Sequence, residues 1–176
     1  EVVHPSLAQK RKQETVLFDD MIWTTQKGYN ELQTKIRHIA TVETVENAKE
    51  IEIARSHGDL RENAEFKSAL EKRSQLQAQL KLFTDQLNKA RIITTEDVSI
   101  DKTGVGNHVT LKKSDGSILT YTLLGPWDAD TDKNILSFQS KLAQAITGNQ
   151  VGETFTFQNE VYTIEHIQSY FDMQTT

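Results

Sequence analysis

Apolar residues in the first half of the chain recur at helical spacing in two long segments. The first segment runs from about Thr25 to His57, lacks Pro and contains a single Gly. Its stripe begins with steps of three, four and three residues, at Tyr29, Leu32, Ile36 and Ile39. The same register continued reaches only Glu43, Glu46 and Glu50, and the apolar residues shift to Val42, Val45, Ala48 and 51–53. The spacing predicts a coiled-coil helix, capped by Thr24 or Thr25, that contains a stutter or a local change of supercoil.

A second helix is predicted from near Asp59 to about Ala90, because its heptad stripe is unbroken. The stripe positions are Phe66, Ala69, Arg73, Leu76, Leu80, Phe83, Leu87 and Ala90. Only a short segment around Ser56, His57 and Gly58 joins it to the first helix. Two helices of about 30 residues, each about 45 Å long, must then fold back on one another. We expect an antiparallel coiled-coil hairpin.

In the second half of the chain, apolar residues recur with a period of about two. Apolar alternation over 108–111 and 118–124 flanks an Asp115-Gly116 turn signal, and a second strand pair is predicted over 154–157 and 161–167. A short helix over 140–147 has Ser140 at its N-cap. The fold class is therefore α+β, with a helical hairpin followed by a small antiparallel sheet with one helix.

Composition and charge divide the chain in the same place. Residues 1–95 hold 15 Lys and Arg against 14 Asp and Glu, whereas residues 96–176 hold five against 11. The acidic half could serve to avoid nucleic acid, to dock on a basic protein surface, or only to keep a small domain in solution. We expect three segments: a tail or linker from a preceding segment over 1–23, a coiled-coil hairpin domain over 24–95 and a sheet domain over 96–176.

Several chemistries are excluded by the sequence. The chain has no Cys, which removes disulfides, thiolate nucleophiles and Cys-ligated zinc. No apolar run approaches the roughly 20 residues of a membrane span, and no export signal is visible, so a soluble protein is expected. No arrangement of Ser, His and Asp supports a hydrolase triad.

The densest polar cluster is the predicted turn, His57 to Phe66. Asp59 and Glu62 stand three residues apart at a helix start, which is the spacing of a capping box, and on spacing alone this interpretation is the simpler one. Carboxylates at that spacing also share one face and can share a hard cation such as Mg²⁺. Two carboxylates alone hold such a cation weakly, so another molecule would complete the site.

The string HGDLRENAEF, at the turn of a predicted coiled-coil hairpin, resembles the Gre family of bacterial transcript cleavage factors (GreA/GreB). Matching patches are TTQKGYNEL at the hairpin start and ILSFQSKLAQAITGNQVGETF near the end. The resemblance covers about residues 24–170. It implies an FKBP-like C-terminal domain and a monomeric protein of the bacterial cytoplasm with no membrane association.

The resemblance also implies a function. Factors of this family bind RNA polymerase at the rim of its secondary channel, on the largest subunit, and pass the coiled coil down that channel. Asp59 and Glu62 then help to hold a Mg²⁺ ion jointly with the polymerase, no metal being bound stably by the factor alone. The polymerase cleaves the 3′ end of its backtracked nascent RNA, and the factor is not itself an enzyme. The alternative is a Gre-like channel regulator that binds without stimulating cleavage.

Two further sets of residues are candidates for contacts. A basic patch for the RNA 3′ segment is predicted at Arg55, Arg61, Lys67, Lys72 and Arg73. Arg73 lies on the heptad stripe, so it is also a candidate to lie within the hairpin. Candidate polymerase-docking residues are Trp127, Asp128, Asp130 and Phe138.

Overall fold

The computed structural model describes residues 20–59 and 63–174, and these form two compact units. The helical unit comprises residues 29–88, and the sheet unit comprises the described residues up to Gly28 and from Lys89 onward. Most of the expected tail, residues 1–19, lies outside the described residues. Ile22 and Trp23, at the end of that expected tail, belong to a strand of the sheet unit, β1 (Ile22–Thr24).

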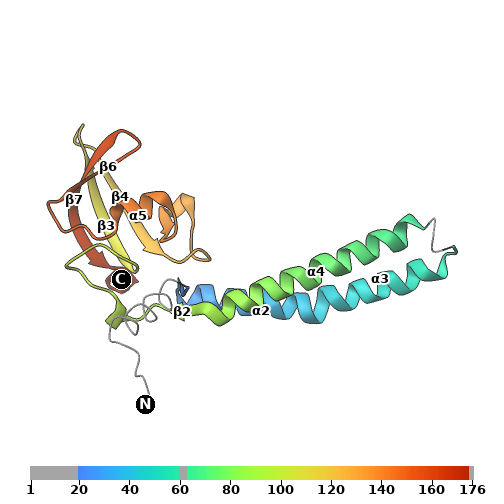
Figure 1. Cartoon of the computed structure of the whole chain (residues 1–176). Coiled ribbons are helices and arrows are strands. Elements are labelled where there is room, and N and C mark those ends of the chain that lie inside the picture. The colour runs from blue at the N-terminus through green and yellow to red at the C-terminus, as the bar shows by residue number, and fades with distance from the viewer. Residues whose placement is uncertain (1–19, 60–62, 175–176) are drawn as a thin grey trace, which may run out of the picture. The chain divides into compact units, whose positions relative to one another are not determined.

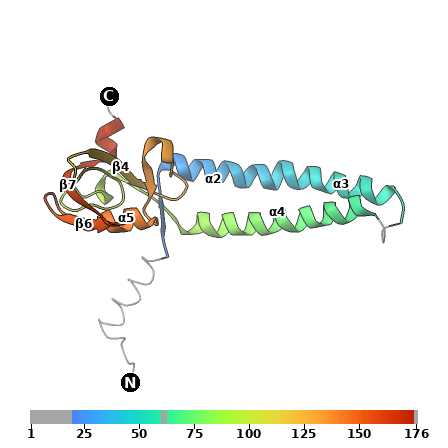
Figure 2. The same cartoon turned by 90° about the horizontal axis from the view of Figure 1, so that it is seen from above.

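The helical unit is an antiparallel hairpin, as predicted. Its first arm consists of α2 (Gln26–His38), a π-helical turn η1 (Ile39–Glu43) and α3 (Thr44–Ser56). Its second arm is a single helix, α4 (Ala64–Lys89), which returns alongside α3 and α2 in both views (Figures 1 and 2). At the far end from the turn, Lys35 of α2 places its ammonium 4.6 Å from the centre of the Phe83 ring of α4.

The predicted interruption of the first apolar stripe is the π-helical turn. The backbone N–H of Thr44 donates to the carbonyl of Ile39, five residues earlier, so this turn contains one residue more than an α-helical turn. Every later position on the buried face therefore lies one residue further along the chain than a regular heptad would place it, and Asn47 and Ala54 are buried. The expected shift of the stripe to Val42 and Val45 is wrong, because both remain exposed.

The second stripe is confirmed with one exception. Ala69 and Leu76 are buried, and Phe66, Leu80, Phe83 and Leu87 are partly buried. Arg73 occupies a stripe position but is exposed, because its long side chain reaches solvent beside the seam. The small side chains at Ala54 and Ala69 allow α3 and α4 to approach closely below the turn.

The sheet unit contains a five-stranded sheet in the order β5-β4-β3-β7-β6. Its strands are β3 (Asn107–Lys113), β4 (Ile118–Leu124), β5 (Ile135–Ser137), β6 (Thr154–Phe157) and β7 (Glu160–Ser169). The two predicted hairpins are β3-β4 and β6-β7, and the α+β class is confirmed. One detail differs from the expected antiparallel sheet, since the short strand β5 adds to β4 in parallel.

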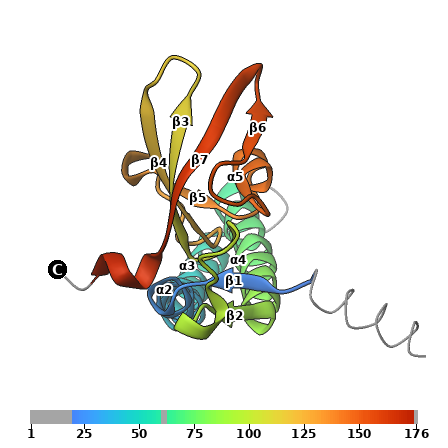
Figure 3. The same cartoon turned by 90° about the vertical axis from the view of Figure 1, so that its left-hand side faces the viewer.

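The core of this unit lies between the sheet and one helix, α5 (Lys141–Ile146). Ser140 caps α5 as predicted, because its Oγ accepts a hydrogen bond from the N–H of Ala143 at 3.2 Å. Figure 3 shows α5 beside β6 at one side of the sheet. The buried residues of this core are Val109, Leu111, Leu123, Ala143, Ile146, Ile164 and Ile167.

Short elements complete the sheet unit. The strand β2 (Ala90–Ile92) directly follows α4 and pairs in parallel with β1, and the Arg91 guanidinium lies 4.7 Å from the centre of the Trp23 ring. Three 3₁₀ turns are η2 (Thr95–Asp97), η3 (Thr131–Lys133) and η4 (Tyr170–Gln174). Among the described residues no helix is both long and apolar enough to cross a membrane.

Candidate functional site at the hairpin turn

The end of α3 fixes the start of the turn. His57 closes the helix, since its backbone N–H donates to the carbonyl of Ala54 at 3.2 Å. Gly58 follows with φ of 128°, a conformation that a residue with a Cβ adopts only under strain. The chain therefore leaves the helix axis at once, and Asp59 lies exposed in the turn rather than on either helix.

The start of α4 is fixed by Asn63, which makes two hydrogen bonds. Its side-chain oxygen accepts from the N–H of Phe66 at 3.0 Å, which is the N-cap interaction. Its amide nitrogen donates to the carbonyl of Ala54 on α3 at 2.6 Å. The expected helix start near Asp59 is therefore wrong: α4 begins at Ala64, and the cap is Asn63 rather than Asp59.

The later start of α4 distinguishes between the two interpretations of Asp59 and Glu62. The capping interpretation required the helix to start beside Asp59, and α4 starts five residues later. Glu62, together with Arg61, lies outside the described residues. The carboxylate pair as a cation site thus stays a prediction, while Asp59 is removed from the role of cap for α4.

A shallow surface pocket of about 460 Å³ opens at the turn. It is lined by His57, Asp59, Asn63, Ala64 and Glu65. His57 Nδ1 lies 3.3 Å from Glu65 Oε2 across the two helix ends. The pocket thus presents carboxylate and amide oxygens, which are the donor type that Mg²⁺ prefers. Within residues 20–59 and 63–174 there is no group of three or more His, Cys, Asp or Glu that could hold a metal ion.

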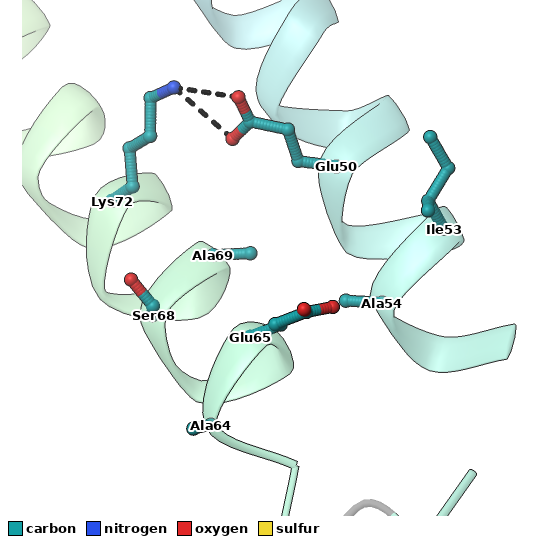
Figure 4. A pocket seen from close by; sticks show the side chains of 8 residues that line it. All are labelled: Glu50, Ile53, Ala54, Ala64, Glu65, Ser68, Ala69 and Lys72. Carbon is teal, nitrogen blue, oxygen red and sulfur yellow. Dashed lines mark hydrogen bonds and ion pairs between the residues drawn. The ribbon is translucent and has the colours of Figure 1, made fainter. Parts of the chain in front are cut away.

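A groove of about 540 Å³ runs between α3 and α4 just below the turn (Figure 4). Ala54 and Ala69 point into it from facing helices, and Glu50 and Lys72 bridge it. Lys72 Nζ lies 2.9 Å from Glu50 Oε1, and this hydrogen bond, followed by one from Asn47, lowers the pKa of Glu50. The Lys72 charge is therefore already paired within the hairpin.

The other members of the predicted basic patch differ in their surroundings. Arg55 is exposed, with its guanidinium 5.9 Å from the centre of the Phe66 ring, and Lys67 is exposed near the start of α4. Arg73 lines a second groove, of about 350 Å³, together with Asn47 and Leu76. Arg55 and Lys67 are thus the described basic residues nearest in sequence to the turn.

The predicted docking residues have contacts within the sheet unit. Asp128 accepts four hydrogen bonds, from the N–H of Gly125 and Thr25 and from the hydroxyls of Thr24 and Thr25. Thr25 in turn caps α2, because its hydroxyl accepts from the N–H of Gly28 at 3.0 Å. These contacts favour a structural role for Asp128, which ties Thr24 and Thr25 to Gly125 within the sheet unit.

The remaining docking candidates are partly buried. Asp130 accepts from the N–H of Asp132 at 3.1 Å at the start of η3, and it lies 3.6 Å from the ammonium of Lys133. Trp127 and Phe138 are each intermediate in exposure. Their role in docking stays a prediction.

Sequence reasoning did not identify the roles of the two asparagines that join the helices, and Asn63 was expected only to brace the carboxylates of the turn. Asn63 stands three residues before Phe66 at the start of the second stripe, and this N-cap signal was available in the sequence. Asn47 had no such signal, because it reaches the seam only through the extra residue of the π-helical turn.

Comparisons with known proteins identify the family. The family description "Transcription elongation factor, N-terminal" matches residues 22–92, and "Transcription elongation factor, GreA/GreB, C-term" matches residues 97–169. Transcription elongation factor GreA of Rickettsia typhi is 35% identical over 147 residues, which cover 83% of this chain and 88% of that protein. The chain therefore belongs to the GreA/GreB family of transcription elongation factors, and the resemblance carried by the turn motif is confirmed.

Other relatives differ in length. Transcription elongation factor GreA of Chlamydia pneumoniae is 45% identical over 172 residues, which are 98% of this chain and 24% of that protein. The chain thus spans about a quarter of the length of this chlamydial relative. The crystal structure of GreA factor homolog 1 of Thermus thermophilus aligns with a TM-score of 0.40 and 18% identity, over 85% of this chain and 99% of that one.

Proposed function

We propose that this chain is a transcript cleavage factor for bacterial RNA polymerase. The sheet unit binds the rim of the secondary channel on the largest polymerase subunit, and the hairpin enters the channel. Asp59 and Glu62 reach the polymerase active site and help to hold a Mg²⁺ ion there. The polymerase then cleaves the 3′ end of its own backtracked RNA, so the chain is an auxiliary factor and not an enzyme.

The observation that carries this proposal is the position of Asp59 in the turn. Asn63 caps α4, because its side-chain oxygen accepts from the N–H of Phe66. Asp59 lies exposed between the two helices, in a pocket with the side chains of His57 and Glu65. This placement supports a function of the carboxylate toward another molecule.

The dimensions of the helical unit agree with a function inside a channel. The 26 residues of α4 correspond to about 39 Å at about 1.5 Å per residue. Two packed helices form a rod only two helix diameters wide. A globular domain of the same length would be wider. A rod of this width suits entry into a narrow channel, with the turn leading.

The donor set at the turn fits a shared Mg²⁺ ion. Mg²⁺ commonly takes one or two protein carboxylates and keeps water or phosphate oxygens as its other ligands. When bound, such an ion supplies charge stabilisation to the attacking and leaving oxygens of phosphodiester hydrolysis. Asp59 and Glu62 contribute oxygen ligands and orient the attacking water, while the polymerase supplies the rest of the site.

Basic residues beside the turn attract the displaced RNA. Phosphate attraction is independent of base sequence and sensitive to salt, which suits an RNA of arbitrary sequence. Arg55, Arg61, Lys67 and Arg73 carry this attraction, and Lys72 contributes less because Glu50 already neutralises its charge.

The test is RNA cleavage in stalled, backtracked bacterial elongation complexes. The parent chain should accelerate release of 3′ RNA fragments, and the Asp59→Asn/Glu62→Gln double variant should bind the polymerase equally without accelerating release. Glu71→Gln removes an exposed carboxylate of α4 outside the turn and serves as the matched control. Binding without acceleration by the parent would indicate the channel-regulator alternative, and no binding would contradict the proposal.

A further inference from the structure

One polar side chain lies inside the apolar seam of the hairpin. Asn47 of α3 is 2% exposed, and no other polar side chain is buried among the described residues of the helical unit. The extra residue of the π-helical turn brings Asn47 to the seam, because a regular heptad from Ile39 would place Glu46 there. The π-helical turn thus exchanges a carboxylate for an amide at a buried position.

Asn47 links the two helices directly. Its side-chain nitrogen donates to the main-chain carbonyl of Ala69 on α4 at 3.0 Å, and it lies 3.4 Å from Glu50 Oε2. Glu50 in turn pairs with Lys72 of α4. A hydrogen bond to a main-chain carbonyl fixes the axial position of one helix relative to the other. Contacts between apolar side chains fix this position only loosely.

A second main-chain link runs in the opposite direction. Asn63, at the start of α4, donates to the carbonyl of Ala54 on α3. The two links enclose residues 47–54 of α3 and residues 63–69 of α4, each about two helical turns or about 10 Å long. Asp59 lies in the turn that follows these linked helix segments.

The sequence also offers α3 another face to bury. Val42 of η1 and Val45 and Ile53 of α3 are exposed at 38%, 47% and 57%, and helical spacing places them on one side of the first arm. A rotated α3 would bury these apolar side chains, at the expense of the Asn47 bond. A single buried Asn commonly selects one register of a coiled coil over apolar alternatives in this way.

We infer that Asn47 is a positioning residue, which sets the register of α3 against α4 and so the place of the Asp59 carboxylate in the polymerase active site. The inference rests on the proposed function for its catalytic consequence. Its structural part, the selection of a register, stands independently of the polymerase.

Asn47→Leu tests the inference, because Leu matches the buried volume and lacks the amide. The chain has no Cys, so spin labels on Glu52→Cys and Glu71→Cys form a unique pair on exposed sites of α3 and α4. Pulsed electron spin resonance should give one narrow distance with Asn47 in place. In the Asn47→Leu variant the distance should shift or split by on the order of 2 Å or more, the scale of a one-residue slip.

The cleavage assay supplies the functional readout. Asn47→Leu should keep the thermal midpoint and the polymerase affinity of the parent, yet lower the maximal cleavage rate by about tenfold or more, since a misplacement of about 1 Å is costly for catalysis. Gln75→Leu adds the same side chain at an exposed position of α4 and should change neither readout. Asn47→Ala provides a second variant if Leu prevents folding.

The outcomes separate the two proposals. An altered label distance without cleavage by the parent chain would support the register and reject the proposed function. Parental cleavage rates and an unchanged distance in both the Leu and the Ala variant would overturn the inference. A lower thermal midpoint, with cleavage reduced only in proportion to the unfolded fraction, would also overturn it, because it would show a merely structural role.

Discussion

Asn63 makes two hydrogen bonds at the turn, and Asn63→Ala removes both. Loss of an N-cap costs about 1 kcal/mol of helix stability. Loss of the bond to the Ala54 carbonyl costs about 1 kcal/mol more, and not the full penalty of a bare carbonyl, because Ala54 still accepts from the N–H of His57. The free energy of unfolding of the helical unit should therefore fall by about 2 kcal/mol.

Asn63→Ser separates the two contributions. A Ser hydroxyl still accepts from the N–H of Phe66 as an N-cap but is too short to reach Ala54, so this variant should lose only about 1 kcal/mol. Urea unfolding followed by circular dichroism at 222 nm measures the stability of the helical unit, because this unit contains most of the α-helical residues. Equal stabilities for the Ala and Ser variants would refute the separation, and a loss below about 0.5 kcal/mol in both would refute the assignment of either bond.

Three further predictions concern the sheet unit. A Cβ on Gly125 would lie 1.9 Å from the carbonyl oxygen of Trp23, so Gly125→Ala should lower the free energy of unfolding, measured in urea, by about 3 kcal/mol. The matched variant Gly104→Ala should lower it little, because the nearest atom to its Cβ would be 4.0 Å away. Asp128→Ala removes the acceptor of four hydrogen bonds and should lower the free energy of unfolding by about 3 kcal/mol. Asp128→Asn should lower it less, because one side-chain oxygen remains. An unchanged urea midpoint in the Asp128→Ala variant would contradict this role. Burial, followed by a neighbouring imidazole, lowers the pKa of His108 from 6.5, so the unfolded chain binds more protons just below pH 6.5. The free energy of unfolding should fall as the pH drops through 6.5 and level off below the folded pKa; His108→Asn should flatten that slope, and an unchanged slope would contradict the assignment.

Much of the helical hairpin followed from residue spacing alone. The heptad from Phe66 to Leu87 predicted α4 because side chains at those steps share one face of any α-helix. The interruption after Ile39 was also visible, but not its structure. A stutter and a π-helical turn leave similar gaps in a stripe, and only the backbone bond from Thr44 to Ile39 distinguishes them.

The parts that sequence did not predict depend on long-range contacts. The strand β5 has three residues, too few to show a periodicity, and it exists because β4 offers a partner. Asp128 was considered for docking because acidic residues are usually exposed, and its bonds to Thr24 and Thr25 come from residues more than 100 positions away. At the turn, spacing alone favoured Asp59 as the cap, and the bonds of Asn63 to Phe66 and Ala54 instead assign the start of α4 to Asn63.

The central claim is that Asp59 and Glu62 help to hold a Mg²⁺ ion in the polymerase active site. The most direct test is a Mg²⁺ titration of RNA cleavage in backtracked complexes, without the factor, with the parent and with the Asp59→Asn/Glu62→Gln variant. Added carboxylate ligands should lower the Mg²⁺ concentration at half-maximal cleavage with the parent, and the double variant should match the factor-free curve. The same half-maximal concentration for the parent and the double variant would contradict the claim.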